Sequence, residues 1–196
     1  MNACFKNRIP LACQLAGLIW LVGVGGGARA LGRGYVAVSD HGPWRGQKSQ
    51  NYEGGHRVPA IAWWPGRITP GSVSAATVMT MDLLPTFLEV TRQSALSGAE
   101  ASDGIDLSDH LFHGKGLPER TLFWRKNLGK AVRQGTWKLL VDPRGTELFD
   151  LATDPGERNN LAGEQPARVR AMLTTLAAWE TKVEASAREL ADSQNN

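Results

Sequence analysis

The chain has 196 residues, of which 42% are hydrophobic and 21% charged, and a formal net charge of +3. This composition is ordinary for a globular protein and excludes a chain that is disordered throughout. The first 33 residues carry four basic side chains and no acidic one, so the rest of the chain has a net charge of −1. Because no basic stripe follows, the sequence predicts no nucleic-acid partner.

The first 30 residues have the pattern of a secretory signal peptide. Lys6 and Arg8 give a short positive region, residues 11–24 form an apolar core, and Ala28-Arg29-Ala30 has the small-x-small form of a cleavage site. Cleavage there removes both cysteines and leaves a chain without thiols, which suits an oxidising compartment. We therefore expect a secreted or periplasmic protein. The alternatives are an uncleaved anchor, which alone would bring the chain to a membrane, and an upstream reading-frame artefact.

The segment that follows combines a predicted strand with candidate metal ligands. Residues 34–38 are apolar and rich in β-branched side chains, as in a buried strand of an α/β sheet. Such sheets bind ligands beyond the carboxyl ends of their strands, where Asp40 and His41 would lie. A hard divalent cation prefers oxygen ligands such as the Asp40 carboxylate, and a neighbouring imidazole can complete part of its shell. Lys48, a few residues later, can neutralise an anionic substrate held at that metal.

The middle of the chain predicts a further strand and a helix. Residues 57–63 are mostly apolar and end at Pro65-Gly66, which indicates a sheet strand closed by a turn. Residues 81–91 predict a helix, because Asp82 lies near its start and Pro85 falls within its first turn. A long connection over residues 94–119 follows, and we expect a subdomain boundary within it.

The last third predicts an antiparallel meander and one long helix. Short apolar runs over 121–125, 130–133, 136–141 and 147–149 are separated by turn sequences. After Pro166, apolar residues recur at helical spacing, at Val169, Met172, Leu173, Leu176, Trp179 and Val183. We expect this helix to pack its apolar stripe across the meander.

In this order and spacing, the motifs resemble those of the sulfatases, the arylsulfatase-like branch of the alkaline-phosphatase superfamily. The resemblance covers about residues 34–185 and is carried by Ser39-Asp40-His41-Gly42-Pro43, Lys48, Glu53-Gly54-Gly55, Arg57, Pro59, Trp64-Pro65-Gly66, Asp82-Leu83-Leu84-Pro85-Thr86 and Trp137-Lys138-Leu139-Leu140. It implies an α/β fold class: the C-terminal part of a sulfatase-like α/β sheet domain over 31–118, then a small antiparallel sheet packed on a C-terminal helix over 119–190. Residues 191–196 are expected to be a disordered tail.

The resemblance also implies a chemistry. Asp40 and His41 would be calcium ligands, Lys48 would contact the sulfate group, and the substrate would be a sulfate ester attacked by hydrated formylglycine. The sequence has no Cys/Ser-x-Pro-x-Arg motif from which formylglycine forms, and no early Asp-Asp pair. No catalytic residue is therefore assigned. We expect the C-terminal half of a sulfatase, inactive alone, in which calcium is held weakly because it takes about 6–8 oxygen ligands.

Two other readings of the whole chain stay open. One is a non-catalytic secreted remnant, or the complementing half of a split enzyme whose partner is a separate N-terminal chain. The other is a phosphodiesterase or phosphonate hydrolase of the same superfamily. A sheet without its neighbouring strands would also expose an edge and an apolar face, which predicts aggregation or partner binding.

Several of these residues have a structural interpretation beside the functional one. Asp40 could cap a turn and Lys48 could be a solvated surface lysine, whereas Glu53 and Arg57 are expected to form an internal structural pair or to partner backbone groups. Gly54 and Gly55 are expected to be backbone-turn residues rather than chemical ones, since glycine permits positive φ. Trp63 and Trp64 are predicted to line the core and a pocket wall, and the acidic series Asp150, Asp154 and Glu157 is predicted to cap turns. The pair His110 and His113 is expected to be a loop feature rather than a zinc site.

Overall fold

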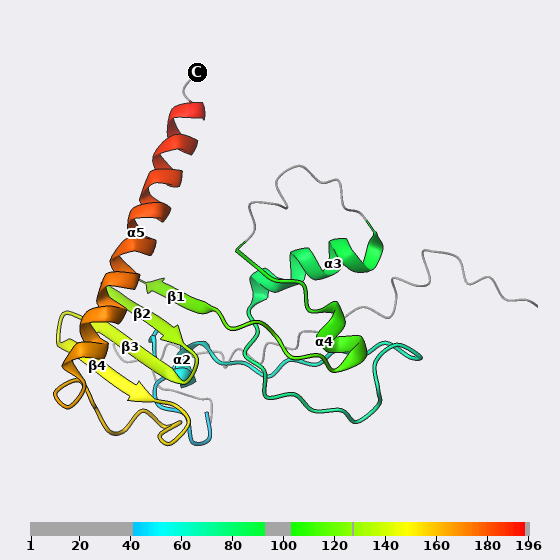
Figure 1. Ribbon diagram of the computed structural model, residues 1–196, viewed down its shortest axis with the longest axis horizontal. Coiled ribbons are helices and arrows are strands. Elements are labelled where there is room, and N and C mark those ends of the chain that lie inside the picture. The colour runs from blue at the N-terminus through cyan, green and yellow to red at the C-terminus, as the bar shows by residue number, and fades with distance from the viewer. Residues whose placement is uncertain (1–40, 93–102, 127, 195–196) are drawn as a thin grey trace, which may run out of the picture. The chain divides into compact units, whose positions relative to one another are not determined.

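The computed structural model describes residues 41–92, 103–126 and 128–194 (Figure 1). These residues form two compact units, one built from 59–118 and the other from 41–58 together with the chain from 119 onward. The second unit thus unites the 41–58 segment with the C-terminal sheet. The predicted signal peptide, the predicted strand over 34–38 and Asp40 lie outside the described residues.

The second unit is built on a four-stranded antiparallel sheet in the order β1-β2-β3-β4. The strands are β1 (Thr121–Lys126), β2 (Gly129–Gln134), β3 (Trp137–Asp142) and β4 (Gly145–Asp150). Two-residue connections join β2 to β3 and β3 to β4, and Gly135 in the first of them has a φ of 59°, which a residue without Cβ adopts at little cost. The predicted meander is confirmed.

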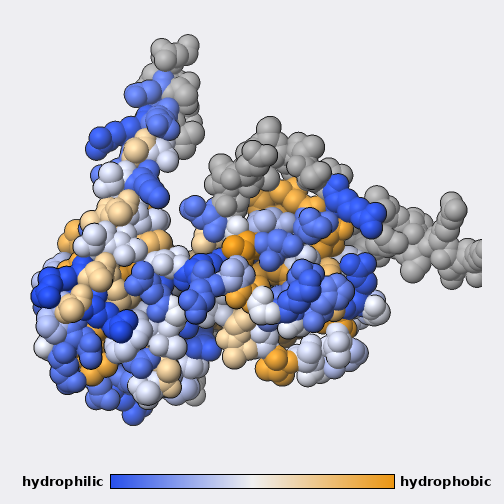
Figure 2. Space-filling model, viewed as in Figure 1, coloured by the Kyte–Doolittle hydropathy of each residue, from blue (hydrophilic) through white to orange (hydrophobic). Residues whose placement is uncertain are grey.

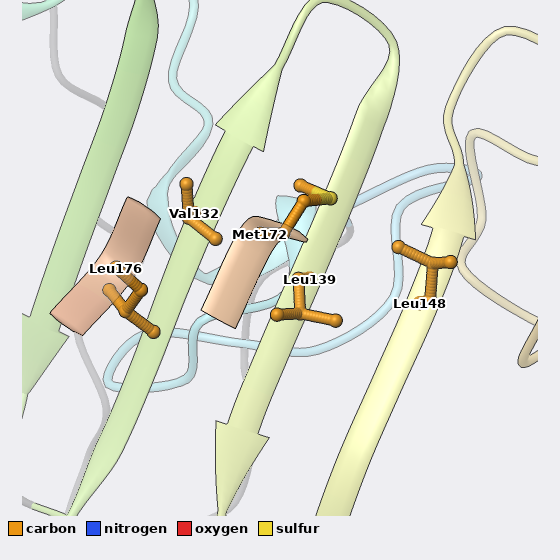
Figure 3. Close-up of a cluster of buried hydrophobic side chains, with 5 residues drawn as sticks. All are labelled: Val132, Leu139, Leu148, Met172 and Leu176. Carbon is orange, nitrogen blue, oxygen red and sulfur yellow. The ribbon is translucent and has the colours of Figure 1, made fainter. Parts of the chain in front are cut away.

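One face of this sheet is covered by the long helix α5 (Pro166–Gln194). Val132, Leu139 and Leu148 lie side by side across β2, β3 and β4, and they pack with Met172 and Leu176 of the helix into a fully buried cluster (Figure 3). This is the apolar stripe that the sequence predicts. The helix also runs through positions 191–194, where the sequence analysis expects a disordered tail.

The opposite face of the sheet is covered by residues 44–57, including the short helix α2 (Glu53–His56). Tyr52 packs with Ala131, Leu140 and Phe149, whose side chains alternate with those that face α5. The ring of His56 stacks on Trp124 at a centroid distance of 4.6 Å. The sheet is thus enclosed between α5 and the segment that carries Lys48 (Figure 1).

The first unit contains the 3-10 helix η2 (Thr80–Asp82) and the helices α3 (Leu83–Thr91) and α4 (Ser108–His113). The helix predicted over 81–91 is confirmed. Asp82 is fully buried and accepts hydrogen bonds from the backbone N–H groups of Met79 and Ile105, at 2.7 Å and 3.0 Å. Its carboxylate therefore ties the start of α3 to the chain that precedes α4.

The strand predicted over 57–63 has no strand pairing within the described residues. A strand needs a hydrogen-bonded neighbour, and the described chain supplies none there. Ile61 is 57% and Trp63 60% exposed, so the prediction that Trp63 lines a core is wrong for these residues. Hydrophobic side chains accordingly reach the surface of this unit (Figure 2).

Candidate functional site

Lys48 lies at the tip of a tight turn on the surface of the second unit. The N–H of Gln50 donates to the carbonyl of Gln47 at 3.0 Å, and the N–H of Gln47 donates to Oε1 of Gln50 at 2.9 Å. Lys48 and Ser49 occupy the two central positions and are both exposed, and Ser49 has a φ of 85°. The turn therefore presents the Lys48 side chain to solvent, where an anion can reach it.

His41, the other described residue of the predicted site, begins the same segment. It is half-buried, and its carbonyl accepts a hydrogen bond from the N–H of Trp44 at 3.2 Å. Across the described residues, no three His, Cys, Asp or Glu side chains gather as a metal site would need. Of the two predicted ligands only His41 lies among the described residues, and calcium takes several oxygen ligands, so the described residues by themselves define no calcium site.

Gly54 and Gly55 are required by close packing rather than by backbone angle. Their role is structural, as predicted, but neither has a positive φ, so left-handed backbone is not the reason. A Cβ on Gly54 would lie 2.7 Å from the carbonyl oxygen of Arg45, and one on Gly55 would lie 2.1 Å from that of Gln50. The glycines let α2 press against the backbone of the turn that holds Lys48.

Beneath α2, the sheet presents two cations side by side. Arg133 on β2 is in register with Lys138 on β3, and like charges directly opposite each other destabilise a sheet. The Glu53 carboxylate lies between them, with Oε1 at 2.8 Å from Lys138 Nζ and Oε2 at 3.5 Å from Arg133 Nη1. Lys138 is fully buried, so this contact with Glu53 is shielded from water.

A second carboxylate completes this cluster from the loop after β4. Oε1 of Glu157 is 2.8 Å from Lys138 Nζ, and its Oε2 accepts the backbone N–H of Glu53 at 2.6 Å. Glu157 is fully buried, so the expectation that it caps a turn is wrong, whereas Asp154 does cap one by accepting two backbone N–H groups at 2.7 Å and 2.8 Å. We call Glu53, Arg133, Lys138 and Glu157 the ionic anchor.

The two carboxylates of the anchor titrate differently. Burial alone would raise the pKa of Glu53, but the hydrogen bond of His56 and the charge of Lys138 lower it to about 2. For Glu157 burial prevails over its attraction to Lys138, and the pKa is raised. Burial likewise lowers the pKa of His56, whose Nε2 lies 3.2 Å from Glu53 Oε1. At neutral pH the imidazole is therefore neutral.

Further contacts hold the same segment to the sheet and the loop that follows it. Arg57 Nη1 lies 3.6 Å from Glu53 Oε2, which confirms the predicted pair. The Arg45 guanidinium lies 4.0 Å over the Tyr52 ring and donates to the carbonyl of Glu157 at 2.8 Å. The Tyr52 hydroxyl hydrogen-bonds Glu147 on β4.

The histidine pair of the first unit lies on α4 rather than in a loop. His110 Nε2 is 2.8 Å from the Ser74 hydroxyl, and its Nδ1 is 2.7 Å from the carbonyl oxygen of Lys115. His113 is exposed and 4.0 Å from Asp109. Both ring nitrogens of His110 thus have hydrogen-bond partners.

Among the helices that the structure describes, none combines the length and apolar character of a membrane span.

Sequence reasoning missed three members of the anchor: Arg133, Lys138 and Glu157. A signal for two of them is present in the predicted hairpin. A two-residue turn at 135–136 places Arg133 opposite Lys138, and two cations on one face of a sheet require an anion between them. Nothing in the sequence distinguishes Glu157 from the other acidic residues that follow β4.

Comparisons with known proteins identify the relatives of this chain. A family model described as Sulfatase matches residues 35–93, the range that contains Asp40, His41 and Lys48. Arylsulfatase G of Homo sapiens is 34% identical over 116 residues, covering 55% of this chain and 22% of the relative. Arylsulfatase A of Bos taurus is 34% identical over 147 residues, covering 58% of this chain and 28% of the relative. The chain thus spans about a quarter of these relatives.

Solved structures share the fold. One, from work on the metabolism of multiple glycosaminoglycans by Bacteroides thetaiotaomicron, superposes with a TM-score of 0.59 at 24% identity. The superposition covers 71% of this chain and 32% of that one. The predicted fold class, a sulfatase-like part that ends in a small antiparallel sheet and a helix, is therefore confirmed.

Proposed function

Because this chain belongs to the sulfatase family, we propose that it supplies part of the site of a calcium-dependent sulfuric ester hydrolase. The observation that carries the proposal is the family match over residues 35–93, which includes both predicted metal ligands and the predicted sulfate contact. In this proposal Lys48 binds a sulfate oxygen, and Asp40 with His41 contributes to a calcium site that other carboxylates complete. Calcium, when bound, stabilises negative charge on the transferring sulfuryl group.

The geometry of the Lys48 turn supports the sulfate role. A sulfate ester is an anion with several acceptor oxygens, and an ammonium with three donors binds such a group as a point charge. Lys48 is exposed at the centre of a turn, and no described acidic side chain forms a salt bridge with it. Its donors are therefore available for an anionic ligand.

Sulfate titration tests this role directly. We expect the side-chain signals of Lys48, followed by NMR of lysine-labelled protein, to shift saturably with sodium sulfate and not with sodium chloride at equal ionic strength. Lys48→Met should abolish the response. Lys126→Met, which removes an exposed lysine on β1, is the matched control. A response shared equally by all exposed lysines would contradict the proposal.

Calcium binding is tested separately, by calorimetric titration of the chain with calcium and with magnesium. We expect weak binding that prefers calcium, because few ligands are present. Asp40→Ala and His41→Ala should each weaken it further. Calcium affinity that neither substitution changes would overturn the assignment of the two ligands.

We further propose that the chain does not turn over substrate alone, since it has no Cys/Ser-x-Pro-x-Arg motif. An assay with a chromogenic aryl sulfate is expected to show no hydrolysis. Hydrolysis of that ester would overturn this statement, and hydrolysis of an aryl phosphodiester instead would favour the phosphodiesterase or phosphonate hydrolase reading.

A second candidate is a complementing chain of a split enzyme, and the exposed apolar side chains of the first unit favour it. Val73 is 96% exposed, and Ile61 and Trp63 are more than half exposed. Co-purification with an N-terminal half of a sulfatase, together with gain of aryl sulfatase activity, would support it.

We also propose that the chain is secreted or periplasmic, which N-terminal sequencing of exported protein would test through cleavage after Ala30.

A further inference from the structure

The segment that carries Lys48 has little regular structure of its own. Between His41 and Arg57 the backbone forms turns at 41–44 and 47–50 and the four-residue helix α2, and the remainder is irregular. Such a segment has few backbone hydrogen bonds within itself, so its conformation depends on contacts with a rigid neighbour. The neighbour in the second unit is the sheet face that bears Arg133 and Lys138.

We propose that the ionic anchor, and Lys138 in particular, positions the turn that presents Lys48, so that the antiparallel sheet determines where a sulfate group is held. This inference rests on the proposed role of Lys48. Lys138 is a positioning residue, because it is fully buried and acts through Glu53 rather than on the ligand.

The anchor joins α2 to the sheet at the first residue of the helix. Lys138 contacts one carboxylate oxygen of Glu53 and Arg133 contacts the other, while the backbone N–H of Glu53 donates to Glu157. Side chain and backbone of Glu53 are thus both fixed. Lys138 is itself held between two carboxylates at 2.8 Å each, so a shift of Lys138 would leave the buried carboxylate of Glu157 without its cation.

Close packing on the other side of α2 couples the position of the helix to the turn that carries Lys48. Gly55 packs so closely on the turn that an added Cβ would lie 2.1 Å from the carbonyl oxygen of Gln50 and 2.8 Å from that of Gln47. Gln47 and Gln50 are the two residues that close the turn around Lys48. A displacement of α2 therefore displaces the turn, because the backbones are already in contact.

Charge explains why the anchor specifies one arrangement. The register of β2 and β3 places Arg133 and Lys138 on the same face with no other strand residue between them. A carboxylate from the covering segment satisfies both cations, whereas an apolar or amide side chain would leave them opposed. The Glu53 carboxylate lies where it satisfies both cations, so α2 has a single favoured position on the sheet.

The test compares three variants of the full chain. Lys138→Met removes the ammonium and leaves two buried carboxylates. The double variant, Lys138→Met with Glu157→Gln, removes one charge of each sign, and the contact between Lys138 and Glu53 is still lost. Lys130→Met is the control, because Lys130 pairs at 2.7 Å with Glu180 of α5, on the other face of the sheet. Amide hydrogen exchange of residues 44–57 and of the sheet, and the response of Lys48 to sodium sulfate, are measured for each.

In both Lys138 variants we expect the amides of 44–57 to exchange at least about tenfold faster, a loss of about 1.4 kcal/mol in local opening free energy. The sulfate response of Lys48 should weaken in parallel, while β2 and β3 in the double variant stay protected. If Lys138→Met does not fold, the double variant carries the test, because its charges are balanced. Lys130→Met should change neither measurement in the Lys48 segment.

The proposal is overturned if wild-type Lys48 responds to sulfate and the double variant matches it in both exchange and affinity. It is also overturned if sheet and segment lose protection equally, since the cluster would then be a core element without a positioning role. If Lys48 of the wild-type chain does not respond to sulfate, the proposed function fails. The positioning inference, which depends on that function, then fails as well.

Discussion

At the scale of residues, the anchor shows one ammonium shared by two carboxylates whose pKa values move in opposite directions. Burial alone would raise the pKa of Glu53, but the hydrogen bond from His56 and the charge of Lys138 prevail, and its pKa falls to about 2. Glu157 has one cation and faces the negative charge of Glu53, so burial prevails and its pKa rises. Ionised Glu53 therefore stabilises the fold at neutral pH, whereas ionised Glu157 costs stability.

The first prediction concerns His56 and pH. Its pKa is lowered by burial in the folded state, so the unfolded chain takes up a proton first and stability falls as pH drops below about 6.5. The contribution of His56 to the free energy of unfolding, taken as the difference between wild type and His56→Gln, should decrease between about pH 7.5 and about pH 5 by at most about 2 kcal/mol. His56→Gln should flatten this slope, and denaturant titrations at both pH values measure it.

The control for this experiment is His113→Gln, which changes an exposed histidine of α4. It should leave the slope unchanged. Below about pH 4.5 a second decrease is expected in all variants, because the stabilisation from ionised Glu53 is lost as pH falls toward its folded pKa of about 2. A slope that His56→Gln leaves intact would contradict the assignment.

The second prediction concerns the close approach at Gly55. Gly55→Ala places a Cβ 2.1 Å from the carbonyl oxygen of Gln50, where the obstacle is backbone rather than a flexible side chain. We expect a loss of roughly 1–3 kcal/mol and faster amide exchange over 47–57. Gly163→Ala is the control, because nothing lies within 4 Å of its added Cβ. Equal effects of the two substitutions would show that packing at Gly55 is unimportant.

At the scale of elements, the two faces of the sheet hold their covering segments by different kinds of contact. The centre of its α5 face is apolar, with Phe123 stacked on Trp179 at 4.9 Å, and the charged pair of Lys130 and Glu180 beside it is partly exposed. Its other face mixes apolar side chains with the anchor. Apolar contact tolerates small shifts of the covering element, whereas paired charges favour one arrangement, so the two faces differ in how strictly they place what they bind.

The third prediction tests the apolar face. Leu176→Ala should cost about 2–5 kcal/mol in the free energy of unfolding, because Leu176 is buried against Val132 and Leu139 and its removal leaves a cavity. Leu128→Ala makes the same chemical change at a side chain that is 75% exposed and should stay within about 0.5 kcal/mol of wild type. Thermal or denaturant unfolding measures both, and equal losses would place the core elsewhere.

The sequence predicts elements well where periodicity and turns agree. The meander and the helix after Pro166 have both signals, and the structure contains them at nearly the predicted bounds. The strand predicted over 57–63 relies on apolar composition without a clear periodicity. A strand also requires a pairing partner, which composition does not identify. In the site, the Glu53–Arg57 pair follows from helical spacing, whereas Lys138 and Glu157 approach from distant parts of the chain, which spacing cannot reveal.

At the scale of the whole molecule, the two units differ in how they treat apolar surface. The second unit buries apolar residues on both sides of a sheet, and among its described residues Val58 and Leu128 are the exposed large hydrophobic side chains. The first unit leaves Ile61, Trp63, Val73, Val78 and Leu84 exposed along its described residues. Contiguous apolar surface promotes association, so any self-association should arise from the first unit.

The last prediction follows from this asymmetry. Ile61→Lys combined with Val73→Lys should lower the apparent mass of the chain at a given concentration, measured by light scattering, because an ammonium resists removal from water at an interface. Leu128→Lys makes the same change at an exposed residue of the second unit and should have no effect. A wild-type chain that stays monomeric over the whole concentration range would contradict the argument, as would equal loss of association in both variants. The comparison assigns the contact to one unit because each substitution adds the same charge, so a general gain in solubility would appear in the control as well.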